Sequence, residues 1–226
     1  RKFTTLFTDK SLRNKILFTF GLIVICRILA QVTIPGANIE ALKVIFNRNQ
    51  ILGLFSMLTG GSAENFSIIL MGLSPYINAS IIIQLLTVIV PKLENLSKEG
   101  EQGRRQLNNY TRWLSLPLAF IQSYGMILLL NSQSPGVPLF ADINNPAVIL
   151  PVMLTVSTGT LLLMWLSELI TENGIGNGSS IIIFIGIIAG IPQIISQSLA
   201  LSQQSSEKLI PFVITLLITL GLTILV

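Results

Sequence analysis

Long runs of apolar residues decide what this chain can fold into. Five of them have the length that an α-helix needs to cross the hydrocarbon core of a bilayer, about 17 to 25 residues. These runs cover residues 16–34, 67–90, 113–130, 148–169 and 179–195. With 51% hydrophobic and only 11% charged residues, the chain has too little polar surface to coat a water-soluble globule. The sequence therefore predicts an all-α, polytopic membrane protein.

A sixth apolar run, 209–226, is cut off by the end of the sequence. We therefore expect the sequence to be part of a longer protein. On this division, residues 1–15 precede the membrane, 16–195 form a unit of five spans, 196–208 form a loop, and 209–226 begin a sixth span.

Basic residues are shared unevenly between the two sides of the expected membrane. They gather before the first run (Arg1, Lys2, Lys10, Arg13 and Lys15) and after the second (Lys92, Lys98, Arg104, Arg105 and Arg112). Short loops rich in Lys and Arg stay cytoplasmic. We therefore expect the segments 1–15 and 91–112 to be cytoplasmic and the loop 196–208 to be external.

Several kinds of chemistry lack the residues they need. The chain has no histidine and one cysteine, Cys26, which rules out an HExxH metal site, a cysteine metal cluster and a Ser-His nucleophile. The glycine-rich stretch 174–178 lacks the Lys-Ser/Thr pair of a phosphate-binding loop. We expect no enzymatic activity, no cofactor and no metal.

The stretch "ILGLFSMLTGGSAENF", 51–66, carries an apolar cluster too short to cross a membrane. Its apolar residues include Leu54, Phe55, Met57 and Leu58, and the glycines Gly60 and Gly61 then interrupt the helical pattern. Two interpretations remain open. The stretch is either a half-helix at about 53–62 that re-enters the membrane or an amphipathic helix on the outer surface.

The second run contains a stripe that is polar at its cytoplasmic end. Leu73, Ile77, Ser80 and Gln84 are spaced i, i+4, i+7 and i+11 and share one helical face. A glutamine exposed to lipid is costly, so this face must meet protein or water. Hydrogen bonding between helices would explain it as well as a functional surface does. Pro75 is expected to permit a kink near the outer end.

The fifth run carries a comparable stripe. Ser179, Ile183, Gly186 and Gly190 share one face, and Gly186 and Gly190 have the GxxxG spacing. That spacing alone is more typical of close helix packing than of a pore.

Arg27 places a charge inside the first run. A charge at this depth must reach the interface or find a partner. We expect a structural contact, such as a hydrogen bond to a backbone carbonyl.

Two long motifs carry a resemblance to a known family. The stretches "PYINASIIIQLLTVIVPKLENLSKEGEQGRRQLNNYTRW" (75–113) and "MWLSELITENGIGNGSSIIIF" (164–184), with "IPG" at 34–36, closely resemble the SecY family of bacterial protein-conducting channels. The resemblance implies ten helices in two halves related by inverted pseudo-symmetry. This sequence would supply the first five-helix half and the start of the sixth helix.

The resemblance also implies roles for particular residues. The pore ring would be Leu73, Ile77, Ser179 and Ile183, and the half-helix at 53–62 would be the plug, with Leu54, Phe55, Met57, Leu58, Gly60 and Gly61. The lateral gate would use Asn78, Ser80, Gln84 and Thr111, and the cytoplasmic partner contacts would be Arg104, Arg105 and Arg112.

The function implied by the resemblance is a passive channel for unfolded secretory proteins, with a lateral gate through which signal sequences and transmembrane segments enter lipid. The implied partners are SecE-like and SecG-like subunits, a SecA motor or the ribosome, translocating polypeptides and the lipid bilayer, with no direct nucleic-acid site. The implied location is the bacterial inner membrane, with a cytoplasmic N-terminus. The alternative is a secondary transporter with broken helices, but such a protein usually needs an ionisable site at mid-membrane. Arg27 is the only ionisable residue well inside an expected span.

Ser179 departs from the branched apolar residues usual in the family's ring, which predicts a slightly wider or wetter constriction. Apolar constrictions gate partly by dewetting. We expect Ser179→Ile to reduce ion leak through the reconstituted channel. Unchanged or increased leak would contradict the prediction.

Overall fold

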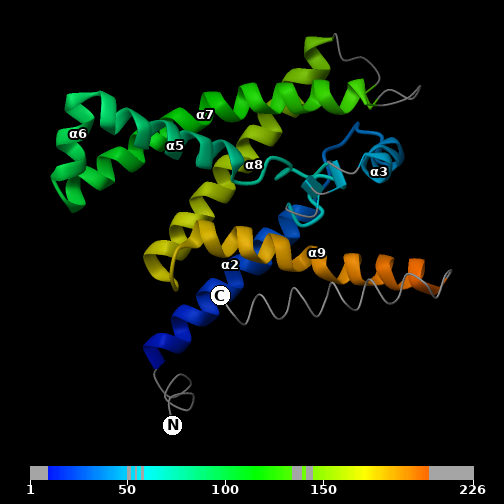
Figure 1. Ribbon diagram of the computed structural model, residues 1–226, viewed down its shortest axis with the longest axis horizontal. Coiled ribbons are helices and arrows are strands. Elements are labelled where there is room, and N and C mark those ends of the chain that lie inside the picture. The colour runs from blue at the N-terminus through cyan, green and yellow to red at the C-terminus, as the bar shows by residue number, and fades with distance from the viewer. Residues whose placement is uncertain are drawn as a thin grey trace.

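The structure is a computed structural model that describes residues 10–49, 52–53, 55–56, 59–133, 139–140 and 145–203, without the side chains of 47–48 and 193–203. The helices of this part of the chain are α2 (Lys10–Gln31), α3 (Ile39–Arg48), α5 (Ser74–Ile89), α6 (Pro91–Lys98), α7 (Glu101–Ser132), α8 (Pro146–Asn173) and α9 (Gly178–Gln203) (Figure 1). The expected all-α fold is confirmed. The run 209–226 lies outside the described residues.

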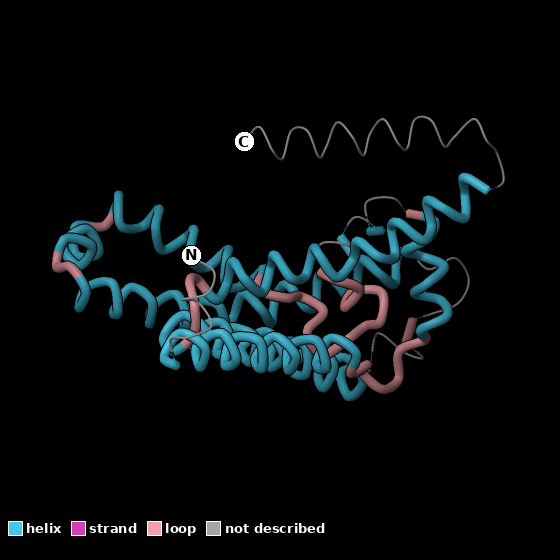
Figure 2. Tube along the Cα trace, turned by 90° about the horizontal axis from the view of Figure 1, so that it is seen from below, coloured by secondary structure: helices cyan, strands magenta, loops and turns pink. Residues whose placement is uncertain are grey.

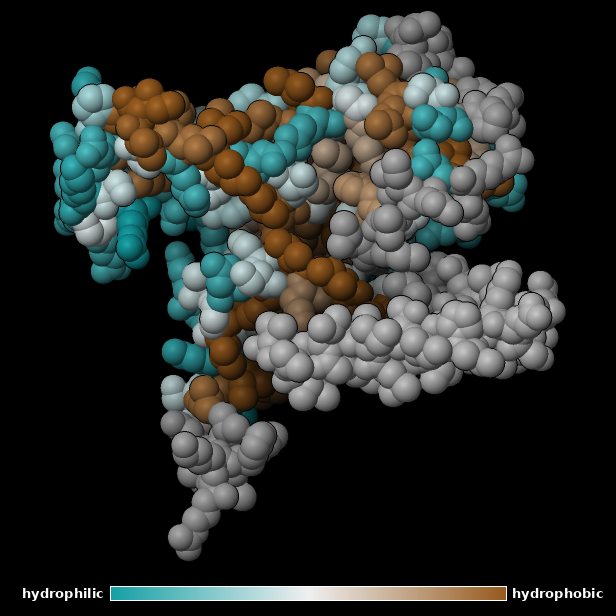
Figure 3. All heavy atoms as spheres, viewed as in Figure 1, coloured by the Kyte–Doolittle hydropathy of each residue, from teal (hydrophilic) through white to brown (hydrophobic). Residues whose placement is uncertain are grey.

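The helices form one layered bundle with a projecting arm. α5 packs along α7, α7 along α8, and α8 against both α2 and α9. The far ends of α5 and α7 extend away from α2 and α9 and are joined through α6, as both ribbon and tube views show (Figures 1 and 2). Hydrophilic residues lie at the outer tip of the α6 end of this arm, and a hydrophobic patch lies beside them (Figure 3).

By length and composition, two of the described helices, α7 and α8, are able to cross a membrane. α5 and α6 make a third span if the two are counted together across their bend of 103°. α2 and α9 coincide with the first and fifth expected spans, and the stretch Gly178–Pro192 of α9 is a shorter apolar helix. The expected number of five spans stays a prediction.

The second apolar run is not one helix from residue 67, as its hydropathy suggests. Ser67 pairs with Thr33 in an isolated β-bridge, residues 68–73 form turns, and helix α5 begins at Ser74. Pro75 lies in the first turn of α5, where its missing N–H has no intrahelical partner to lose. Pro75 therefore starts the helix, and the expected kink is replaced by a helix N-terminus. Gly72 permits the change of direction with a left-handed φ of +56°.

The expected loop 91–112 is helical. Val90 is extended before Pro91, as residues that precede proline tend to be, and the chain bends there into α6. Gly100 then reverses the chain, and residues 101–112 are the first turns of α7. The expected external loop 196–208 is also helical as far as Gln203, because residues 196–203 contain no glycine or proline to end α9.

Small side chains let these helices approach closely. The buried face of α7 repeats nearly every fourth residue, with Gly103, Thr111, Ser115, Ala119 and Ser123. On α8, an added Cβ at Gly159 would lie 2.0 Å from the carbonyl oxygen of Ile68. The chain that precedes α5 therefore crosses α8 in direct backbone contact.

Two apolar clusters form the core. One joins α3 and the chain 59–71 to the adjoining ends of α7 and α8 and includes Leu42, Phe66, Ile127 and Val156. The other joins α2, α8 and the start of α5 and includes Leu22, Leu73 and Leu163.

Replacing Gly159 by alanine tests the crossing of α8 and the Ile68 carbonyl. The new Cβ has no room, and overpacking of this kind costs about 1 to 3 kcal/mol. We expect Gly159→Ala to lower the thermal unfolding midpoint of the detergent-solubilised complex. Gly125→Ala on α7 is the matched control, because nothing lies within 4 Å of its added Cβ. Equal behaviour of the two variants would contradict the close crossing.

Candidate functional site

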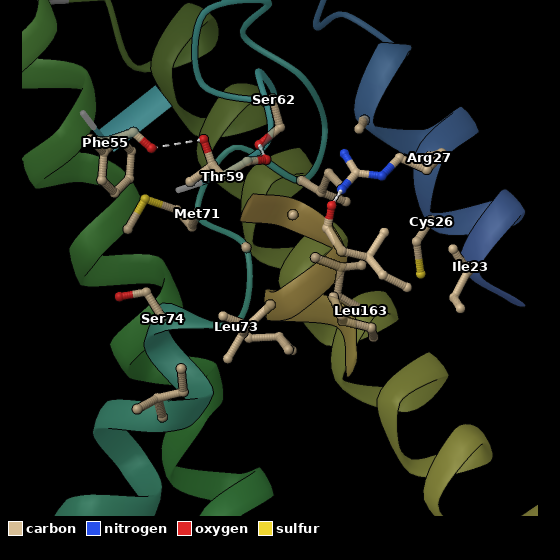
Figure 4. A pocket seen from close by; sticks show the side chains of 18 of the residues that line it. Ile23, Cys26, Arg27, Phe55, Thr59, Ser62, Met71, Leu73, Ser74 and Leu163 are labelled. Atoms are coloured by element: carbon tan, nitrogen blue, oxygen red, sulfur yellow. Dashed lines mark hydrogen bonds between the residues drawn. The ribbon is translucent and has the colours of Figure 1, made fainter. Parts of the chain in front are cut away.

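A cavity of about 320 Å³ lies where α2, the chain 59–74, α5, α8 and α9 meet (Figure 4). Most of the side chains that line it are apolar, and among them are Ile23, Leu163 and Ile182. Among the described residues that line it, Arg27 is the one with a charged side chain. Such a cavity offers a passage or a binding surface for apolar groups, with a single cation at one side.

The structure brings three of the four expected ring residues to this cavity. Leu73 lies just before α5 and is 4% exposed, and the N–H of Ile77 donates to its carbonyl at 2.9 Å. Ile77 is 36% exposed, and Ile183 of α9 is 38% exposed. All three side chains line the cavity. Two helices from distant parts of the sequence thus present branched aliphatic side chains to the same space.

Ser179, the fourth ring residue, is directed elsewhere. Its hydroxyl lies 2.7 Å from the hydroxyl of Ser167 on α8, and Ser179 does not line the cavity. The Ser167 side chain is buried, so this hydrogen bond joins the start of α9 to α8. That Ser179 wets or widens a ring stays a prediction.

The expected half-helix at about 53–62 is described only in part and stays a prediction. Leu54, Met57 and Leu58 lie outside the described residues. Phe55 packs against the core, and Thr59 Oγ1 donates to the carbonyls of Phe55 and Ser56, both at 3.1 Å. These bonds connect Thr59 to the described residues that precede it in the chain.

Gly60 and Gly61 come directly after Thr59. Their φ angles are +64° and +82°, in the left-handed region where glycine is favoured. Residues 59–66 then run in turns, and Phe55, Thr59 and Ser62 line the cavity. Side chains of this stretch therefore border the same cavity as three of the ring residues, and the re-entrant half-helix stays a prediction.

Arg27 makes the kind of contact that its position in the sequence suggests. Its Nη1 donates to the carbonyl of Gly60 at 3.5 Å, and its Nη2 donates to the carbonyl of Ile185 on α9. The guanidinium thus joins α2 to α9 and to the turn at residues 59–62, which we call the glycine turn (Figure 4).

The expected gate residues do not form one cluster in the described part of the chain. Asn78 and Gln84 are exposed on α5, and Gln84 Nε2 donates to Ser80 Oγ at 3.3 Å. Asn78 also lines the cavity. Thr111 is buried on α7, and its hydroxyl donates to the carbonyl of Leu107 at 3.0 Å. Its hydrogen bond is therefore made within its own helix.

Two of the three expected cytoplasmic contacts have ionic partners. Arg105 pairs with Glu101 at 3.0 Å on the exposed surface of α7. Arg112 Nε donates to Glu168 Oε1 at 2.6 Å and so connects α7 to α8. Arg104 is exposed and forms no ion pair with a described residue.

Sequence reasoning missed the part that the first apolar run plays in this site. Ile23, Arg27 and Ala30 of α2 all line the cavity. Their spacing of i, i+4 and i+7 marks one face of a helix and was available as a signal. Ser167 and Glu168, by contrast, gain their partners only through packing between α8 and its neighbours.

Comparison with known proteins finds relatives that match most of this chain. A family model described as SecY matches residues 67–226. A protein translocase subunit SecY from Rickettsia typhi is 44% identical over 208 residues, which cover 88% of this chain and 46% of that relative. The protein of the same name from Pseudomonas aeruginosa is 45% identical over 189 residues, which cover 83% of this chain and 42% of that relative. The chain thus spans just under half the length of these relatives.

Solved structures show the same fold. The Sec61 of a canine ribosome-channel complex from the endoplasmic reticulum matches with a TM-score of 0.60 and 19% identity, over 92% of this chain and 46% of that one. A structure described as a protein conducting channel matches with the same values. The expected SecY-like fold is confirmed.

Charge reversal tests the ion pair between α7 and α8. The Arg112 and Glu168 side chains are 43% and 19% exposed, so the pair is partly screened, and we expect it to contribute about 1 kcal/mol. Arg112→Glu or Glu168→Arg should lower the thermal midpoint of the detergent-solubilised complex, and the double reversal should restore part of it. Arg105→Glu is the control, because both side chains of its pair are almost fully exposed. A double reversal as unstable as the sum of the single changes would contradict the pairing.

Proposed function

The chain belongs to the SecY family, and from this premise we propose that it forms the first half of a passive protein-conducting channel in the bacterial inner membrane. It is a multi-pass membrane protein. The polypeptide would pass through the cavity bounded by α2, α5 and α9, and the driving force would come from a partner. The N-terminus and α6 would face the cytoplasm, where basic residues gather.

One observation carries this proposal: Leu73, Ile77 and Ile183 converge on a single cavity. Branched aliphatic side chains from two helices form a seal that does not distinguish one passing chain from another. An apolar constriction of this kind also opposes the flow of water and ions. Both properties suit a channel that conducts unfolded polypeptides and excludes small solutes.

The chain around Gly60 is the proposed plug. Phe55, Thr59 and Ser62 line the same cavity as the ring residues. These three residues border the space through which a polypeptide would travel, which supports a plug at this place. Its displacement would open the path without unfolding any of the longer helices.

The lateral gate is proposed along the exposed face of α5. Asn78 and Gln84 are exposed there, on the opposite side from the buried Ala79 and Ile83. Interhelical hydrogen bonds in membranes contribute about 0.6 kcal/mol on average. A few such bonds to the second half of the channel would hold the gate closed and still break reversibly. Thr111 is the least suited of the four predicted gate residues, because its side chain is buried and its hydroxyl is bonded within α7.

The hairpin of α6 and the start of α7 is the proposed docking site for a SecA-type motor or the ribosome. Arg104 is the best placed of the predicted contacts, since Arg105 and Arg112 already have carboxylate partners. SecE-like and SecG-like subunits would complete the membrane complex.

A secondary transporter fits the cavity less well. Coupling to protons or sodium usually needs ionisable or carbonyl-rich coordination at mid-membrane. In the described cavity wall the one charged side chain is the cationic Arg27, which donates to two backbone carbonyls.

Cysteine crosslinking to a stalled precursor tests the channel. We would use the full-length protein with its partner subunits, replace Cys26, and place single cysteines at Leu73, Ile77, Ile183 and Ser179. A secretory precursor with one cysteine, stalled halfway, should form disulfides at the first three positions. Ser179→Cys should react less, because the side chain at this position faces Ser167.

Ile121 and Phe184 serve as controls, since both are exposed apolar residues that do not line the cavity. No crosslinks at Leu73, Ile77 and Ile183, in a complex shown to hold the stalled chain, would refute the pore assignment.

A further inference from the structure

Arg27 is a lone cation in the wall of an apolar cavity. It forms no ion pair with any described residue, and its two acceptors are backbone carbonyls on different segments. A cation at this depth in a membrane span is costly unless it is hydrogen-bonded. The Arg27 guanidinium therefore needs these carbonyls as hydrogen-bond acceptors. The side chain points from α2 toward them (Figure 4).

The backbone conformation of Gly60 and its lack of a side chain both favour the contact with Arg27. Its φ of +64° disfavours any residue with a side chain. An added Cβ would also lie 2.6 Å from Arg27 Nη1 and 2.8 Å from the carbonyl oxygen of Gly186 on α9. The absence of a side chain is what allows the glycine turn to lie directly between Arg27 and α9.

The carbonyls of Gly60 and Ile185 belong to segments that are attached to the rest of the protein in different ways. Ile185 belongs to α9, so the contact of Arg27 with its carbonyl joins two long helices. Gly60 belongs to a turn whose other hydrogen bonds are local: Ser62 donates to the carbonyl of Thr59 at 3.0 Å, and the N–H of Gly61 donates to that of Ser56 at 2.8 Å. These local bonds would travel with the turn if it moved. The contact of Arg27 with Gly60, by contrast, would break.

The chain just after the turn is firmly attached. The N–H of Ile34 donates to the carbonyl of Phe66, and the N–H of Ile68 donates to that of Val32, both at 3.0 Å. Asn65 also donates to Gln31 at 3.3 Å. A displacement of the turn would therefore pivot near residues 63–68.

We propose that Arg27 is a positioning residue that holds the glycine turn against α9 in the closed channel and releases it at the Gly60 carbonyl when the channel opens. The proposal rests on the plug role proposed above. The guanidinium stays bound to the Ile185 carbonyl after release, so the cation keeps a partner and the turn can return to it.

The test measures access to the turn in the full-length protein, reconstituted with its partner subunits in proteoliposomes. The parent carries Cys26→Ala and Ser62→Cys, because Ser62 is 1% exposed and close to Gly60. A membrane-impermeant maleimide added from the external side reports the exposure of this cysteine. Arg27→Met removes the donors at similar length, and we expect labelling about 10-fold faster, since hydrogen bonds to charged groups are the stronger ones. Arg27→Lys keeps the charge and should give less than about a 3-fold increase.

Lys15→Met is the matched control, because it removes a cation from the same helix away from the cavity. Its labelling rate should equal that of the parent. Gly60→Ala probes the contact from the other side and should also accelerate labelling, even if Arg27→Met assembles poorly. If both residues act through one contact, the double variant should label no faster than the more severe single variant.

A stalled precursor in the parent channel separates this proposal from the plug proposal. If the precursor does not accelerate labelling of Ser62→Cys, the plug role is wrong. If it does, but assembled Arg27→Met and Gly60→Ala label no faster than the parent, the plug role stands and the role of Arg27 is refuted. Equal acceleration by Arg27→Met, Arg27→Lys and Lys15→Met would also refute it, because a general loss of stability would explain that pattern.

Discussion

The irregular backbone between residues 59 and 73 is the constraint on which the rest of the structure depends. Such backbone inside an apolar helical protein must find partners for its N–H and C=O groups within the protein. The extended chain after α2 supplies them on one side, where Ile34 donates to Phe66 and Ile68 donates to Val32. Arg27 supplies a donor for Gly60 on the other. α2 is therefore needed both as a helix and as a source of hydrogen bonds.

The position of α5 and the existence of the cavity follow from this irregular chain. Because residues 68–73 form turns, α5 begins only at Ser74. Leu73 and Ile77, at the N-terminal end of α5, line the same cavity as Ile183 of α9. α8 must then pass close behind the turns, and Gly159 provides the missing volume against the Ile68 carbonyl.

The sequence was sufficient for the all-α fold, because apolar runs are a local property. The resemblance to the SecY family, rather than helical spacing alone, pointed to three cavity residues, Leu73, Ile77 and Ile183. The sequence could not show that α5 begins late, since apolar residues in buried turns have the same hydropathy as those in a helix. The direction of the Ser179 side chain depends on Ser167, which belongs to another helix. The carbonyls that accept from Arg27 carry no side-chain signal at all, so only the packing of α9 and the glycine turn reveals them.

The contacts are distributed in a way that favours movement of the glycine turn over movement of the helices. α7 is held to α8 by an ion pair at 2.6 Å and to α5 and α8 by a face of small residues, so these three helices behave as one unit. The chain near Ile68 is locked against Gly159 of that unit. The turn at Gly60, by contrast, meets Arg27 through one long hydrogen bond of 3.5 Å. One side-chain hydrogen bond attaches the turn at Gly60, whereas several contacts fix the chain near Ile68. Under the function proposed above, the passage of a polypeptide would therefore displace the turn first and leave the helices in place.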